Sequence, residues 1–343
     1  LKKYQQWLID YINEHPNFVY PKFRTKQVLE FLKEPINDLC ISRPKERLSW
    51  GIELPFDRDY VTYVWFDALL NYISGTLINN RQKYWPADLH VIGKDILVPA
   101  HGIYWPIMLH ALGFPLPHTL LTHGWWLCSG EKMSKSLGNV VNPMDYAHEY
   151  GTDAFRYYLI REMSVGQDCD FNHERFVIRY TTDLGNDLGN LLSRTVNMIQ
   201  RYCNGIVPAI SDMNDPLIEQ WRDTKDKALA NYSDFTFNNA LEHIFAFISA
   251  VNKYIEQHSP WTLAKSTDLA DKSKLQTILG ITAESLRLSA FLLSPVLPNS
   301  SKMILDALGC DCVVSWDNLE FGNSLNGNSV GNNVILFPRK EKK

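Results

Sequence analysis

The feature that most limits the possible folds is a change of pattern near residue 172. Before it, short β-branched and aromatic runs alternate with segments of helical periodicity, an order typical of a parallel sheet with right-handed crossovers. The expected strands are 60–64, 89–92 and 120–123. After residue 172, long amphipathic helices are expected between proline-rich joins, at 173–203, 216–232, 235–257, 272–294 and 298–308. The pattern therefore predicts an α/β region followed by an all-α helix bundle.

Composition excludes several classes of protein. Hydrophobic residues make up 45% of the 343 residues and charged residues 21%, which is typical of a globular chain. The formal net charge of −4 argues against a general nucleic-acid binder, so we expect no DNA partner and only local RNA contacts. No apolar run of about 18 residues occurs, so no membrane association is expected. The six cysteines form no Cys-x-x-Cys pair, which predicts neither a disulfide framework nor a zinc site and favours a reducing, cytoplasmic location.

The segment from Leu116 to Pro143 carries the strongest chemical signal. An expected strand leads into a glycine-punctuated loop and then into the run Lys132-Met133-Ser134-Lys135-Ser136. Two lysines three apart, interleaved with serines and followed by a glycine, predict a mobile cationic loop. Such ammonium groups suit a polyphosphate whose charge must be stabilised while a phosphoryl bond breaks. A solvated surface turn is the ordinary alternative for an arbitrary Lys-Ser-Lys pattern.

This run matches, letter for letter, the KMSKS signature of the class I aminoacyl-tRNA synthetases, and the following Gly138-Asn139-Val140-Val141 also fits. Three further stretches resemble the methionyl-tRNA synthetase family, and the resemblance covers essentially the whole chain. They are 63–72 (YVWFDALLNY), 92–96 (IGKDI, followed by His101) and 123–126 (HGWW). The resemblance implies that the α/β region is the second half of a Rossmann-like nucleotide-binding domain. The family's HIGH signature does not occur here. Because the chain also opens on an amphipathic pattern without methionine, we expect it to be part of a longer protein.

The resemblance implies a methionine pocket with polarizable aromatic walls and a polar edge for the thioether. Its residues would be Arg43, Trp65, Ala68, Leu69, Tyr72 and His101. Taken alone, Trp65 and Tyr72 are seven apart on one helical face and would more often be core residues. The sequence departs from the family in two respects. His101 lies one residue further from Gly-Lys-Asp than is usual, which indicates an insertion within 97–100, and Leu39 stands where many relatives carry a pocket tryptophan.

The resemblance also implies an ATP site. Its residues would be Gly93, Asp95, His123, Trp126, Lys132, Ser134 and Lys135. Gly93 permits close backbone approach, and the carboxylate of Asp95 can accept both ribose hydroxyls, although it could equally cap the following helix. Lys132 and Lys135 would be the catalytic residues, bracing pyrophosphate. Mg²⁺ would accompany ATP.

The helix expected at 173–203 has an apolar stripe and a polar stripe. The polar stripe contains Asn186, Asn190, Arg194, Asn197 and Arg201. Amide and guanidinium groups suit the base edges of splayed single-stranded RNA. The resemblance assigns Asn190, Arg194 and Trp261 to the tRNA anticodon, with the indole stacking on a base. A solvated helix face and a buried tryptophan are the alternatives.

The function implied by the resemblance is ATP-dependent activation of L-methionine to methionyl-adenylate and transfer to tRNA(Met). The expected domains are the end of an inserted connective region (1–57), the second half of the Rossmann-like catalytic domain (58–136), a stem-contact region (137–172) and an α-helical anticodon-binding domain (173–343). Two alternatives remain: a class I synthetase for a branched aliphatic amino acid, and a non-catalytic tRNA-binding fragment. Without the HIGH half, we expect this chain alone to be inactive.

Overall fold

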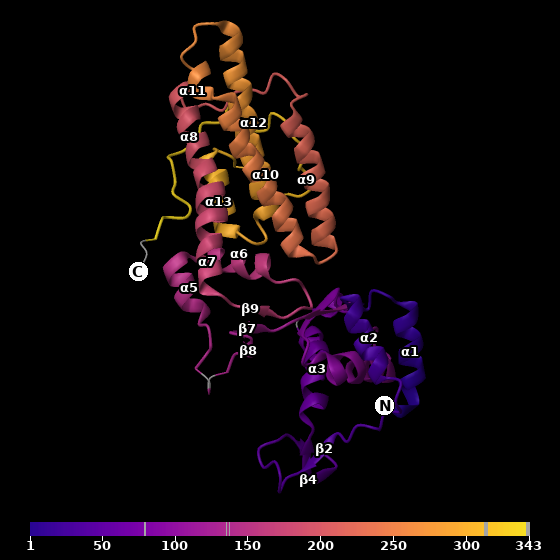
Figure 1. The fold of residues 1–343 in the computed structure, drawn as a ribbon. Coiled ribbons are helices and arrows are strands. Elements are labelled where there is room, and N and C mark those ends of the chain that lie inside the picture. The colour runs from indigo at the N-terminus through magenta and orange to yellow at the C-terminus, as the bar shows by residue number, and fades with distance from the viewer. Residues whose placement is uncertain (79, 135, 137, 312–314, 341–343) are drawn as a thin grey trace. The chain divides into compact units, whose positions relative to one another are not determined.

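The computed structural model describes residues 1–340 apart from 79, 135, 137 and 312–314 (Figure 1). The chain divides into two compact units. The first contains Leu1–Trp125 together with the short segment Val165–Asp168, and the second contains Trp126–Ser164 and Cys169–Lys343. The predicted order, an α/β region followed by a helical region, is confirmed.

The first unit is built on a three-stranded parallel sheet. Its strands are β1 (Val19–Tyr20), β6 (Thr119–His123) and β5 (Leu89–Gly93), in the order β1-β6-β5. The register pairs Leu89 with Thr119 and Gly93 with His123. The strands expected at 89–92 and 120–123 are therefore confirmed, and their carboxyl ends meet at one edge of the sheet.

The strand expected at 60–64 was assigned to the wrong sheet. It is β4 (Asp57–Thr62), which pairs antiparallel with β2 (Ser42–Pro44) and β3 (Glu53–Leu54) in a separate small sheet. The charged start of β4 is exposed, and Val61 is its only fully buried residue. A strand of a parallel sheet is buried on both faces, so the acidic and basic residues at 57–59 exclude β4 from it.

Helices cover the parallel sheet and form two small cores. Those of the first unit are η1 (Lys2–Tyr4), α1 (Gln5–Glu14), α2 (Lys22–Phe31), α3 (Val64–Leu77), η2 (Gln82–Tyr84), η3 (Leu97–Tyr104) and α4 (Trp105–Leu112). The segment η3 is interrupted by a kink at Val98, whose backbone is extended (φ −114°, ψ 125°). Across it, the backbone N–H of His101 reaches the carbonyl of Ile96, five residues back, at 3.1 Å. A single inserted residue is commonly accommodated in a helix as such a wide turn. The insertion inferred within 97–100 would fall in this wide turn, and it stays a prediction.

The second unit begins with a small sheet that the sequence pattern did not reveal. It contains β7 (Trp126–Cys128), antiparallel to β8 (Glu131–Lys132) and parallel to β9 (Cys169–Asp170). These strands have only two or three residues, too few for a period-2 pattern to be detected. Two short helices follow, α5 (Pro143–Tyr150) and α6 (Thr152–Glu162).

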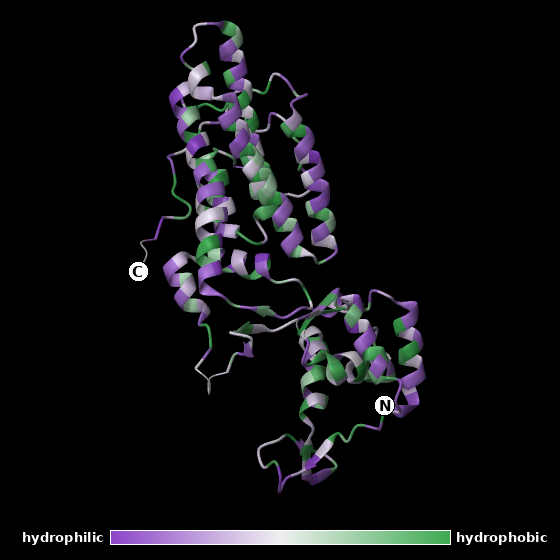
Figure 2. Ribbon diagram, in the orientation of Figure 1, coloured by the Kyte–Doolittle hydropathy of each residue, from purple (hydrophilic) through white to green (hydrophobic). Residues whose placement is uncertain are grey.

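The remaining helices form the predicted bundle. They are α7 (His173–Arg179), η4 (Tyr180–Gly189), α8 (Asn190–Tyr202), α9 (Pro216–Ser233), α10 (Phe237–His258), α11 (Pro260–Leu263), α12 (Leu269–Leu293) and α13 (Pro298–Ala307). The first three run on without a break. Hydrophobic residues gather along the middle of the bundle, where α10 and α12 run (Figure 2). The helix α12 contacts α8, α10 and α13, which explains why it is buried on every side from residue 278 to 293.

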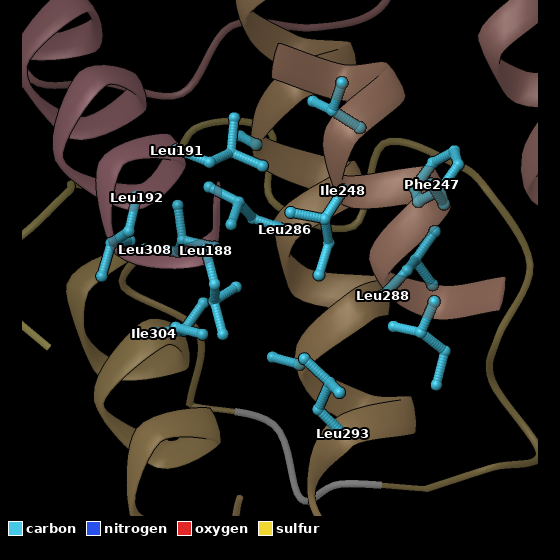
Figure 3. Close-up of a cluster of buried hydrophobic side chains, with 14 of the residues drawn as sticks. Leu188, Leu191, Leu192, Phe247, Ile248, Leu286, Leu288, Leu293, Ile304 and Leu308 are labelled. Atoms are coloured by element: carbon cyan, nitrogen blue, oxygen red, sulfur yellow. The ribbon is translucent and has the colours of Figure 1, made fainter. Parts of the chain in front are cut away.

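The centre of the bundle is an interdigitated aliphatic core. In Figure 3, Leu191 of α8 lies close to Ile248 of α10 and Leu286 of α12, and Ile304 of α13 lies near Leu188. All of these side chains are at most 1% exposed. Burying a side chain of this size contributes roughly 1.5–3 kcal/mol, so this core fixes the position of α8. Among the described residues, no helix combines the length and apolar character needed to cross a bilayer.

Candidate functional site

Tyr72 and His101 are brought together although they are 29 residues apart in sequence. The imidazole of His101 is 2% exposed. Its Nδ1 lies 2.9 Å from the carbonyl of Ile96, and its Nε2 lies 2.9 Å from the Tyr72 hydroxyl. Because a carbonyl only accepts, Nδ1 carries the proton and Nε2 accepts from the hydroxyl. Burial lowers the pKa of His101, with a smaller opposing effect of the bond to Ile96, so the neutral form is favoured.

Four of the predicted pocket residues lie on α3 (Val64–Leu77), with different degrees of burial. Leu69 is 1% exposed and belongs to a small core with Ile73 and Trp105. Trp65 is half-buried and meets His101 edge-on, with ring centroids 5.9 Å apart. Tyr72 is 39% exposed, and Ala68 is exposed as well. Leu69 is therefore a core residue, whereas Trp65 and Tyr72 keep exposed surface that a small molecule could contact.

Arg43 is held by its own strand. It lies on β2, donates from Nη1 to the carbonyls of Ser42 at 2.8 Å and Cys40 at 3.2 Å, and covers the ring of Tyr63 at 4.3 Å. It lines a hollow of about 450 Å³ together with Tyr104. None of these contacts joins Arg43 directly to the Tyr72–His101 pair.

Gly93, Asp95 and His123 gather at the carboxyl ends of β5 and β6. Gly93 and His123 are cross-strand partners. A Cβ at Gly93 would lie 2.7 Å from Oδ1 of Asp95, so only glycine lets that carboxylate fold back over the strand end. His123 points its Nδ1 at the carbonyl of Gly124, 2.7 Å away. Asp95 and His123 are exposed, as a binding role would require.

Two residues outside the sequence prediction hold this edge in place, Trp125 and Asp168. The Trp125 indole N–H donates to Oδ1 of Asp95 at 3.3 Å. The ammonium of Lys94 lies 4.0 Å above the Trp125 ring and pairs with Asp168 at 2.6 Å. That ion pair, together with a hydrogen bond from the Trp125 backbone N–H, lowers the pKa of Asp168.

The segment carrying Asp168 packs directly on the end of β6. A Cβ on Gly124 would come within 1.9 Å of the carbonyl oxygen of Gln167, so the two backbones touch. Arg24 also donates to the carbonyl of Gly166 at 2.8 Å. Because Lys94 and Asp168 are 74 residues apart, no local pattern could have connected them.

The loop that carries the two lysines, residues 132–139 of the second unit, contains two hydrogen bonds from one side chain, that of Asn139. Its Oδ1 accepts from the backbone N–H of Ser134 at 2.8 Å, and its Nδ2 donates to the carbonyl of Lys132 at 3.3 Å. Lys132 ends β8 and is exposed. Lys135 lies outside the described residues. Trp126 begins β7 and is half-buried beside Tyr158, with ring centroids 6.0 Å apart.

Arg194 and Trp261 meet on the surface of the bundle, where α8 runs beside α11 (Figure 1). The guanidinium lies 6.0 Å from the indole centroid and pairs with Glu256 at 2.6 Å. Asn190 begins α8, one turn before Arg194, and is exposed. The structure thus brings the three predicted anticodon residues onto one surface and adds Glu256, for which the sequence pattern gave no signal.

A parallel sheet followed along the chain by the KMSKS sequence and then by a helix bundle is typical of one class of protein, the class I aminoacyl-tRNA synthetases. The family described as tRNA synthetases class I (M) matches residues 1–196. The family described as the anticodon binding domain of methionyl tRNA ligase matches residues 207–337. The chain belongs to the methionyl-tRNA synthetase family.

Known proteins of this family are similar over nearly the whole chain. The methionine–tRNA ligase of Caldanaerobacter subterraneus subsp. tengcongensis is 43% identical over 99% of this chain and 54% of its own length. That of Clostridium tetani is 44% identical with the same coverage. A solved structure of Mycobacterium tuberculosis methionyl-tRNA synthetase in complex with methionyl-adenylate superposes with a TM-score of 0.91 at 36% identity, covering 98% of this chain and 67% of that one. The chain spans about half the length of the curated relatives it matches.

Proposed function

We propose that the protein to which this chain contributes activates L-methionine with ATP and transfers the methionyl group to tRNA(Met). The observation that supports the proposal is the Tyr72–His101 pair beside the half-buried Trp65, because these side chains would give a thioether aromatic walls and one polar edge. Leu69 would close the base of the slot and Ala68 would leave room at its rim. Arg43 would meet the amino-acid carboxylate, which a guanidinium binds well.

Nucleotide binding is assigned to the strand ends and to the loop. Gly93, Asp95 and His123 would contact the adenosine, with Asp95 on the ribose hydroxyls, and Trp126 would contact adenine through its backbone. Lys132, Ser134 and Lys135 would contact the phosphates. The two lysines would be the catalytic residues, acting through charge and placement rather than as nucleophiles.

Mg²⁺ would enter with the ATP phosphates. Among the described residues, no group of three His, Cys, Asp or Glu side chains is placed to hold a metal ion. The Mg²⁺ ion would be held mainly by substrate phosphates and water, as is usual for this ion. The chemistry that the ion supplies is shielding of phosphate oxygens.

The bundle is proposed to read the anticodon. Asn190 and Arg194 would contact base edges, and Trp261 would stack on a base. The same proposal assigns 1–57 to the connective region, 58–136 to the catalytic domain, 137–172 to stem contacts and 173–343 to the anticodon. It includes a cytoplasmic location, which family membership supports because the other substrate is tRNA.

The test is amino-acid-dependent ATP–pyrophosphate exchange in the full-length protein. Methionine should support exchange, whereas leucine, isoleucine and valine should not. Tyr72→Phe should raise KM for methionine by about fivefold. The substitution removes the hydroxyl that donates to the buried Nε2 of His101, and losing such a hydrogen bond costs about 1 kcal/mol. The matched control is Tyr60→Phe, since that tyrosine has similar exposure on β4.

Each outcome distinguishes the proposal from an alternative. Exchange driven by a branched amino acid would assign the chain to another class I enzyme. No exchange in the full-length protein, with normal tRNA binding, would favour a non-catalytic RNA-binding protein. An unchanged KM in Tyr72→Phe would remove Tyr72 and His101 from the methionine site.

A further inference from the structure

The helix α8 carries the same pair of side chains twice. Asn190 and Arg194 are separated by three residues, and Asn197 and Arg201 repeat that spacing seven residues further on. Seven residues are close to two helical turns, so the second pair lies on the same face about 10 Å further along the axis. The proposed anticodon function uses only the first pair.

The second pair borders a hollow in the surface. Its volume is about 620 Å³, and it is lined by Asn197, Met198, Gln200, Arg201 and Tyr202. Asn197, Gln200 and Arg201 are exposed, Tyr202 is partly buried, and Met198 is 8% exposed. The hollow thus combines amide donors and acceptors, one guanidinium and an aromatic side chain, which together suit an unstacked nucleotide.

The two arginines differ in their surroundings. Arg194 is paired with Glu256 at 2.6 Å. Arg201 forms no ion pair or hydrogen bond with any other described residue. Gln200 is held by a hydrogen bond from its Nε2 to the carbonyl of Gly331 at 2.8 Å, which fixes one wall of the hollow. The guanidinium of Arg201 is therefore an uncompensated positive charge beside a formed hollow, an arrangement complementary to a phosphate.

We propose that this hollow is a second RNA contact, occupied by the strand that continues from the nucleotides bound at Arg194 and Trp261. Arg201 binds a backbone phosphate, Asn197 hydrogen-bonds the base or sugar edge, and Tyr202 supplies the apolar wall. This inference rests on the proposed anticodon function and adds to it a contact that does not depend on sequence. Phosphate contacts position a nucleic acid, whereas base contacts specify it.

The test is equilibrium binding of the full-length protein to a tRNA(Met) anticodon stem-loop and to a second stem-loop with a changed anticodon, over a series of salt concentrations. Arg201→Gln should weaken binding of both RNAs by the same factor, about 3- to 10-fold. It should also reduce the salt slope of the binding constant by about one. Arg194→Ala should instead reduce discrimination between the two RNAs.

The control is Arg222→Gln on α9, an exposed arginine of the same bundle that is paired with Glu219 and whose loss changes the net charge by the same amount. It should leave RNA affinity unchanged, and Arg201→Lys should restore most of the salt slope. Circular-dichroism melting should show that each variant is folded. Wild-type binding by Arg201→Gln together with defective binding by Arg194→Ala would overturn this inference and leave the anticodon proposal intact. Wild-type binding by both would overturn both. If Arg222→Gln weakened RNA binding as much as Arg201→Gln, the effect would come from net charge alone, and this result would also overturn the inference.

Discussion

His90 should make the first unit sensitive to acid. It lies on β5, is 6% exposed, and packs between Tyr72, with ring centroids 4.4 Å apart, and Trp105, with centroids 6.4 Å apart. Its Nδ1 is buried and has no hydrogen-bond partner among the described residues. Burial, with a smaller effect from the charge of His101, lowers the pKa of His90 to about 4.

The magnitude follows from proton linkage. The pKa of His90 falls from the ordinary 6.5 to about 4 on folding, so the unfolded chain binds the proton more tightly. The stabilisation is complete above about pH 6.5 and is lost as the pH falls towards 4. A shift of this size corresponds to about 3 kcal/mol at about 1.36 kcal/mol per pH unit. The pKa of His101 is shifted in the same direction, so it adds to the loss.

The measurement is the free energy of opening of the β5 and β6 amides by hydrogen exchange between pH 7 and pH 4.5, because it reports on this unit alone. His90→Phe keeps the ring and removes the titration, so its opening free energy should fall less on acidification, by about 2 kcal/mol over this range. His118→Phe at an exposed position is the control. Equal pH slopes for wild type and His90→Phe would refute the reasoning.

Three further predictions concern the bundle and the loop. Glu284 and Arg287 form an ion pair in which both side chains are at most 2% exposed, so Glu284→Ala should lower the free energy of unfolding by about 3–5 kcal/mol in urea titrations. A change below about 1 kcal/mol would contradict this burial argument. Glu256→Gln should release Arg194 from an exposed ion pair and tighten anticodon stem-loop binding about twofold in a filter-binding assay; weaker binding would show that the pair orients the arginine. Asn139→Ala removes two hydrogen bonds from the lysine loop, about 1 kcal/mol each, and should slow pyrophosphate exchange of the full-length protein about tenfold. KM for methionine should stay the same. A rise in that KM would show that the loop affects methionine binding and would contradict the prediction.

The long elements could be predicted because their burial is periodic. Within α8, Leu191, Thr195 and Ile199 recur at helical spacing and are all buried, so the pattern and the packing agree. The strand at 60–64 failed because β-branched and aromatic residues occur in exposed hairpins as well as in parallel sheets. The third strand of the parallel sheet, Val19–Tyr20, has too few residues to form a pattern.

The candidate site could be predicted only for residues that lie within a recognisable sequence motif. The resemblance pointed to Tyr72 and His101, and their contact follows from packing α3 against η3, which no local pattern encodes. The individual roles of the predicted site residues remain predictions. Asn139 could have been found, because an asparagine close after two serines commonly bonds the backbone of its own loop. Glu256 could not, because its partner Arg194 is on another helix.

Asp168 shows why residues that support a site are harder to find than those that form it. The carboxylate of Asp168 fixes Lys94, the ammonium of Lys94 covers Trp125, and the indole of Trp125 donates to Asp95. Each step is a contact of 2.6–4.0 Å, yet the two ends of the series, Asp95 and Asp168, are 73 residues apart in sequence. The arrangement depends on Gly124, because any side chain there would push the Asp168 segment away from the sheet edge. Gly124 thus acts by allowing its backbone to contact that of Gln167. Only the folded chain shows that Gln167 is the residue in contact.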